Sequence, residues 1–148
     1  MKKWMMAAVL LVSSAACSDD ENTLTGSMSE VYDLGFDSVA VVRQGDSVSV
    51  EYRQDSGGKT AKLVVNLAGL TKVDNVGIDL TELAGGSPRG TLQRVQAVTT
   101  DYPLERGTVT FDHAPDVGAD VKGSFHCTLS NPAGRTLNGD FSATVTAP

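Results

Sequence analysis

The sequence is poor in the residues that build catalytic and metal sites. Its 148 residues include only two cysteines and two histidines, and one tryptophan, three tyrosines and four phenylalanines are its only aromatic residues. It contains no Gly-x-Ser-x-Gly nucleophile elbow, no EF-hand loop and no phosphate-binding glycine loop. These absences argue against the common hydrolase, calcium-binding and nucleotide-binding classes, and no cofactor is predicted.

A long hydrophobic run is also missing. The uncharged stretch at residues 4–16 would make a helix of about 20 Å, short of the roughly 30 Å hydrocarbon core of a bilayer. It follows Lys2 and Lys3 and ends in the small residues "SSAA" before Cys17. A basic start, an apolar middle and a small-residue end are typical of an export signal that is removed on maturation.

The cysteine at this junction makes residues 14–17, Ser-Ala-Ala-Cys, resemble the lipobox of bacterial lipoprotein precursors. The resemblance covers residues 1–17 and departs from the family at Ser14, where a leucine-like residue is usual. It implies a diacylglycerol on the sulfur of Cys17, cleavage before that residue and acylation of the new amino terminus, for example with palmitate. Ser18 stands where the family's inner-membrane retention aspartate would be, which favours the outer membrane. The alternative is an ordinary secretory signal with an incidental Cys17.

Positive charge is scarce. The chain carries a formal charge of −6, and removal of Lys2 and Lys3 with the signal leaves −8 on the mature protein. An acidic surface argues against nucleic acid as a partner and against electrostatic docking on anionic lipid. The membrane is therefore expected to be reached through the lipid on Cys17.

Beyond the signal the sequence is typical of an all-β protein. Residues 1–16 are assigned to the lipoprotein signal peptide, residues 17–23 to the lipidated cysteine and an acidic tether, and residues 24–148 to a single β domain. No run keeps a helical period for three turns, whereas Val, Thr and Gly recur at short spacings. The expected fold is a single antiparallel β-sandwich or small barrel, rich in meanders, with about seven to nine strands.

The clearest strands lie in residues 37–67, "DSVAVVRQGDSVSVEYRQDSGGKTAKLVVNL". A two-residue turn at Gly45-Asp46, of type II′ because glycine comes first, and a second tight turn at Ser56-Gly57 would link three strands with one common buried face. The expected partners are Val41 with Val50, Val39 with Tyr52, Val50 with Leu63, and Val48 with Val65.

One pattern occurs twice near the end of the chain. Residues 121–130, "VKGSFHCTLS", and residues 137–146, "LNGDFSATVT", share the frame apolar-x-Gly-x-Phe-x-small-Thr-apolar. A type I turn at Pro132-Ala133 followed by left-handed Gly134 would join them in a hairpin with matched faces. This turn would pair Asn131 with Arg135, Leu129 with Leu137, Cys127 with Gly139, Phe125 with Phe141, and Gly123 with Ala143. Residues 24–32 echo the frame weakly.

The middle of the chain is less regular. Strands are expected near residues 76–80, 92–98 and 108–113, with a short helical turn at residues 80–84. Residues 84–90, "AGGSPRG", and 101–107, "DYPLERG", are predicted loops because of their glycine and proline content.

Few residues suggest chemistry. His126 falls on the polar face of its strand and His113 at a strand end, and nothing in the spacing brings Ser87 near either, so two exposed histidines are preferred to a hydrolase site. Cys127 alternates onto the apolar face and is predicted to be a buried, inert thiol.

One acidic loop is a candidate metal site. Asp112, Asp116 and Asp120 recur at intervals of four, but without EF-hand spacing they are interpreted as a solvated acidic loop, and no metal site is predicted.

The sequence therefore predicts a lipid-anchored envelope protein, placed at the outer membrane and facing the periplasm or the cell surface. Its expected role is non-catalytic: an accessory, scaffold or interaction module with envelope protein partners. The alternative is a calycin-like protein that holds a small apolar ligand in the periplasm. The shortage of aromatics favours the first, because a ligand-holding barrel usually lines its interior with them.

Overall fold

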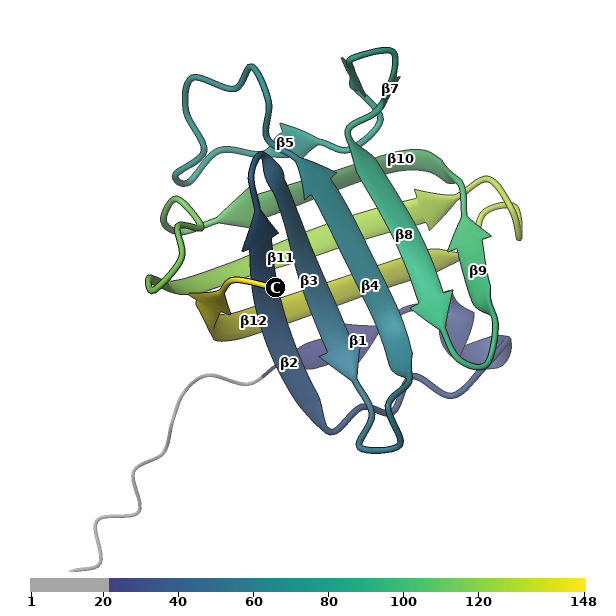
Figure 1. Ribbon diagram of the computed structural model, residues 1–148. Coiled ribbons are helices and arrows are strands. Elements are labelled where there is room, and N and C mark those ends of the chain that lie inside the picture. Colours follow the sequence, from purple (N-terminus) through teal and green to yellow (C-terminus); the bar gives the residue numbers. More distant parts are fainter. Residues whose placement is uncertain (1–21) are drawn as a thin grey trace, which may run out of the picture.

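A computed structural model describes residues 22–148 of the chain (Figure 1). The described part is almost entirely β-structure, as predicted, with one short 3-10 helix, η1 (Ser27–Glu30). It has twelve strands, more than the seven to nine expected, because three of them are only two residues long. The strands are β1 (Thr23–Thr25), β2 (Ser38–Gln44), β3 (Ser47–Arg53), β4 (Lys59–Asn66), β5 (Ile78–Asp79), β6 (Leu83–Ala84), β7 (Ser87–Pro88), β8 (Gly90–Val95), β9 (Thr99–Tyr102), β10 (Leu104–Phe111), β11 (Asp120–Leu129) and β12 (Thr136–Thr146).

Ten strands form one curled sheet. Nine follow the order β5-β10-β11-β12-β2-β3-β4-β8-β9, and β1 pairs with β12 beside them. In Figure 1, β2, β3, β4 and β8 form a front layer, and β10, β11 and β12 cross behind it. Every pairing in this sheet is antiparallel except the short parallel contact of β12 with β2. The architecture is that of a β-sandwich or small barrel.

The chain passes from one layer to the other through a single bent segment. β9 pairs with β8 in the front layer, and β10 pairs with β11 in the back layer. Only Pro103 separates the two strands. A strand that changes sheets at a bend is the usual way to turn a corner between crossed layers. Residues 101–107, predicted to be a loop, therefore belong largely to strands, because a proline at a strand junction does not end the extended chain.

The meander β2–β3–β4 has the predicted register. Val41 lies opposite Val50, and Val50 lies opposite Leu63. Gly45 has a φ of 60°, as the first loop position of a type II′ turn requires. The second turn is wider than predicted, because the register shifts between Tyr52 and Arg53.

The β11–β12 hairpin keeps its predicted buried face, but its partners are shifted by two residues. Cys127 lies opposite Leu137, not Gly139, and Phe125 lies opposite Gly139, not Phe141. The predicted pairing was wrong because the connecting loop is longer than three residues: β11 ends at Leu129 and β12 begins at Thr136.

The shifted register explains why the pattern occurs twice. Phe125 lies opposite Gly139, and Phe141 lies opposite Gly123. A Cβ atom on Gly139 would lie 2.5 Å from Cε1 of Phe125, and one on Gly123 would lie 2.4 Å from Cζ of Phe141. Each phenylalanine ring therefore covers the glycine of the other copy, and the repeat serves packing.

Two other predictions for the middle of the chain are corrected. The helical turn expected at residues 80–84 is absent, and the short helix of the described chain is η1 instead. Residues 84–90 include part of the β6–β7 hairpin, in which Leu83 pairs with Pro88.

The interior between the layers is filled by aliphatic side chains from both, joined by a few aromatic residues. Tyr52 donates a hydrogen bond from its hydroxyl to the carbonyl of Asp140, at 2.7 Å, and so ties β3 to β12 across the core. Its ring meets Phe125 and Phe36 edge-on. The largest fully buried side chains are Tyr52, Phe111, Phe125, Met28, Leu63, Leu80, Leu92, Leu129, Leu137, Val41, Val48 and Val50.

Candidate functional site

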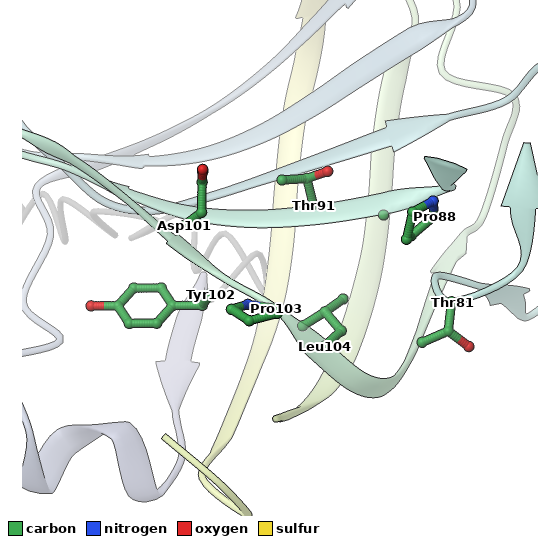
Figure 2. A pocket seen from close by; sticks show the side chains of 8 residues that line it. Thr81, Pro88, Thr91, Asp101, Tyr102, Pro103 and Leu104 are labelled. Carbon is green, nitrogen blue, oxygen red and sulfur yellow. The ribbon is translucent and has the colours of Figure 1, made fainter. Parts of the chain in front are cut away.

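A surface groove lies at the corner where β9 bends into β10. It has a volume of about 450 Å³. Figure 2 shows Tyr102, Pro103 and Leu104 following one another along the bend, with Thr91 of β8 beside them. We call it the corner groove; its lining residues are Thr81, Pro88, Gly90, Thr91, Asp101, Tyr102, Pro103 and Leu104.

The corner groove exists because two strands lose their neighbours here. β8 pairs with β4 from Gly90 onward, but its pairing with β9 begins only at Leu92. β10 pairs with β11 from Leu104, but its pairing with β5 begins only at Thr108. The strand edges at residues 90–91 and 104–107 therefore flank the groove without a strand between them.

Leu80 closes the groove toward the core. Its N–H donates to the carbonyl of Gly107 at 2.9 Å, and its carbonyl accepts from the N–H of Gly90 at 2.7 Å. Its side chain is fully buried, and a Cβ on Gly90 would lie only 2.6 Å from the Cβ of Leu80. One residue thus bridges β8 and β10 where no strand fits, and glycine is needed at position 90.

The β6–β7 hairpin forms one lip of the groove and is held by a buried arginine. Arg89, 7% exposed, donates to the carbonyls of Asn66 and Ala68 at 2.7 and 2.9 Å. Its Nε donates to Glu82 at 3.2 Å. On this lip Leu83 is 65% exposed.

The groove is apolar within and acidic at its edges. Pro88, Pro103 and Leu104 supply apolar surface. Asp101 lines the groove, and its carboxylate accepts a hydrogen bond from Gln93 at 2.7 Å. The exposed Glu105 follows Leu104, and the exposed Arg106 comes next on the same strand. This chemistry suits an apolar group flanked by positive charge.

A cation–aromatic stack adjoins the groove at Tyr102. The Tyr102 ring stacks on Tyr32 with centroids 6.2 Å apart, and the Arg94 guanidinium lies 4.1 Å above the Tyr32 ring. Burial raises the pKa of Tyr32 to about 12, with a further rise from Tyr102 and an opposing effect of Arg94. Sequence reasoning missed this stack, since no spacing relates its residues.

A second feature missed by sequence reasoning is a buried carboxylate on the outer face of β3. Glu51 is 4% exposed and is held by Arg53 at 2.5 Å, Lys59 at 3.0 Å and Lys62 at 3.9 Å. Burial raises the pKa of Glu51, but the hydrogen bonds from Lys59 and Arg53 outweigh it, so the net pKa lies below its usual range. Only the strand register brings these residues together.

The two histidines lie apart from the corner groove. Nδ1 of the exposed His113 is 3.1 Å from a carboxylate oxygen of Asp112, and Nδ1 of His126 is 3.1 Å from Oδ1 of Asn138. Ser87 lies on β7, in another part of the fold. Within residues 22–148, no hydrogen bond joins a hydroxyl or thiol to either histidine, so neither is placed as the base of a nucleophile.

The acidic loop divides its carboxylates among different partners. Asp112 accepts from the N–H of Lys122, Asp116 pairs with Arg43 at 2.9 Å, and Asp120 accepts from the Thr144 hydroxyl at 2.5 Å. A hollow of about 630 Å³ brings Asp112 and Asp120 together with other polar residues of β11 and β12. Among the described residues, no cluster of three or more potential metal ligands occurs.

The two cysteines differ. Cys127 is a buried core residue, and burial raises the pKa of its thiol to about 12, as expected of an inert thiol. Cys17 lies outside the described residues, as does most of the predicted tether. No described helix is long and apolar enough to cross a membrane.

Comparisons with protein-family models, with curated proteins and with solved structures find no match to this chain.

Proposed function

We propose that the protein is a lipid-anchored, non-catalytic interaction module of the bacterial outer membrane. The observation that carries this proposal is the filled interior: the side chains that line it are packed as a hydrophobic core, which leaves binding to the outer surface. No described hydroxyl or thiol is bonded to a histidine, which argues for binding rather than covalent catalysis. The anchor is the lipid on Cys17.

The attachment point supports an outward-facing corner groove. Asn22 accepts a hydrogen bond from the N–H of Ser142 at 2.7 Å, and Ser142 lies opposite Lys122, near the Phe111 end of β10. An extended chain from Cys17 to Asn22 spans about 18 Å at most. The corner groove lies at the other end of β10, about 23 Å further along the strand. A lipid on Cys17 would thus be tethered to one end of β10, whereas the groove opens at the other.

The test has two parts. Metabolic labelling with a clickable palmitate analogue should mark the wild-type protein and not Cys17→Ser; labelling that survives the substitution would refute the anchor. In a complementation assay at matched protein levels, Cys17→Ser should lose activity, because the protein leaves the high effective concentration of the membrane plane.

The matched variant replaces both His113 and His126 by glutamine. We expect nearly full activity from it, since both side chains are on the surface and neither contacts a nucleophile. Loss of activity with an intact circular dichroism spectrum would instead identify an enzyme.

A second candidate function is the binding of a small apolar ligand, as in calycin-like proteins. The volume of the corner groove favours it, because about 450 Å³ lies within the usual range for ligand pockets. Native mass spectrometry of the purified protein separates the candidates: a copurifying small molecule favours this one, and a copurifying protein favours the first.

A further inference from the structure

We infer that the corner groove receives an extended peptide segment of a partner protein, with an apolar side chain in the groove and basic residues beside it. This inference rests on the proposed function and names the kind of partner that the module binds.

The backbone geometry suits an extended chain. The edges of β8 at residues 90–91 and of β10 at residues 104–107 lack a strand neighbour on the groove side, apart from the single bridging residue Leu80. Leu80 already bonds the N–H of Gly90 and the carbonyl of Gly107, so the edge that is left for an added strand is that of β10 from Leu104 onward. Pairing of a peptide with the N–H and carbonyl groups of such an edge is a common mode of peptide recognition. A globular small molecule would leave those groups unused.

The side chains suit an apolar residue. Pro88 and Leu104 line the groove, and Leu83, which pairs with Pro88, is 65% exposed on the adjoining lip. A large aliphatic side chain exposed beside an apolar hollow gains by burial against a partner.

The charges select a basic segment. Asp101 lines the groove, Glu82 on the hairpin is 57% exposed, and Glu105 is exposed beside Leu104. Two cations lie nearby: Arg89 is buried and bonded to Glu82, and the exposed Arg106 donates a hydrogen bond to the Thr128 hydroxyl of β11 at 3.3 Å, so the three carboxylates outnumber the cations. Lysine or arginine in the partner would meet these carboxylates, which favours association and disfavours acidic partners.

The experiment measures peptide binding to the full-length lipidated protein in detergent micelles by fluorescence anisotropy. The probe is a fluorescein-labelled peptide, KVKLKVK, compared with its acidic counterpart EVELEVE and with KVKLKVK methylated on alternate backbone nitrogens. We expect KVKLKVK to bind, EVELEVE not to bind, and N-methylation to weaken binding about tenfold, because it removes the strand hydrogen bonds.

Matched variants separate the groove from general attraction between an acidic protein and a cationic peptide. Asp101→Lys should weaken KVKLKVK binding about fivefold more than Asp46→Lys, which makes the same charge change in the β2–β3 turn. Leu83→Ser should weaken binding about threefold, whereas Val117→Ser, at another exposed aliphatic residue, should not.

Three results would overturn the inference: no binding of KVKLKVK, equal binding of the N-methylated peptide, or equal weakening by the two lysine variants. None of them bears on palmitate labelling of Cys17 or on complementation, so failure here is distinguishable from failure of the proposed function. Occupation of the groove by the apolar dye N-phenyl-1-naphthylamine without peptide binding would favour the small-ligand candidate instead.

Discussion

The meander β2–β3–β4 and the hairpin β11–β12 are both antiparallel and both bury one face, yet they differ in how far they keep the register that their sequences predict. In the meander, two residues, Gly45 and Asp46, separate β2 from β3, and so short a turn leaves one way to pair the strands. In the hairpin, residues 130–135 connect the strands. A longer connection leaves the register to contacts elsewhere.

Those contacts come from the corner between β9 and β10. The N–H and the hydroxyl of Ser130 both donate to the carbonyl of Pro103, at 2.9 and 3.0 Å. Leu129 donates to the carbonyl of Arg135 at 2.7 Å and closes the wide loop. The start of the loop is therefore held by the β9–β10 bend, so tertiary contacts override local turn chemistry. A two-residue turn thus fixes the register locally, whereas longer connections, residues 54–58 and residues 130–135, permit shifts of one and two residues respectively.

The largest expected effect on stability comes from substitutions in the core of the β11–β12 hairpin. Phe125→Ala or Phe141→Ala should each lower the free energy of unfolding by about 3–5 kcal/mol, because each removes a buried ring and leaves a cavity. Urea denaturation measures this. On the outer face of the same strands, Lys122→Ala and Asp140→Ala should change it by about 0.5 kcal/mol or less. A larger loss from the outer pair would mean that the faces are exchanged.

A smaller effect tests the register directly. Gly139→Ala should destabilise by about 1–3 kcal/mol, because the new methyl group meets the Phe125 ring and the Tyr52 hydroxyl, each 2.5 Å away. Gly35→Ala is the matched control, since its Cβ would meet only the Asp33 side chain. In a double-mutant cycle, Phe125→Leu should relieve part of the Gly139→Ala loss. Additive losses would favour the pairing of Gly139 with Cys127 instead.

The smallest expected effect on stability comes from a substitution on the outer face of the meander, and its size depends on pH. The pKa of Glu51 in the folded protein lies below its value in the unfolded chain, which is about 4.3. The ion pairs of Glu51 with Arg53, Lys59 and Lys62 therefore stabilise the fold fully above that unfolded pKa. This stabilisation is lost as the pH falls through the folded pKa. Glu51→Gln should therefore cost about 1–2 kcal/mol at pH 7 and less at pH 3, measured by urea denaturation at both. The exposed Glu105→Gln is the control. An equal loss at pH 3 and pH 7 would show that the charge of Glu51 is not what stabilises the meander.

Part of the candidate site could be predicted from the sequence. Alternation placed Cys127 in the core and His126 outside, and both placements are confirmed. The corner groove could not be predicted, because Pro103 caused residues 101–107 to be interpreted as a loop and not as the ends of β9 and β10. A proline has no N–H to donate, which suggests a break, but at a strand junction that N–H is not needed.

The β class, the buried face of each clear strand and the register across the two-residue turn can all be derived from the sequence alone. These follow from the period of two and from local backbone geometry, which involve only neighbours in the chain. The folded arrangement of the layers is needed to explain which glycine each phenylalanine covers, how Leu80 closes the corner and which cations surround Glu51. Those contacts join residues far apart in the chain, so they depend on how the layers pack against one another.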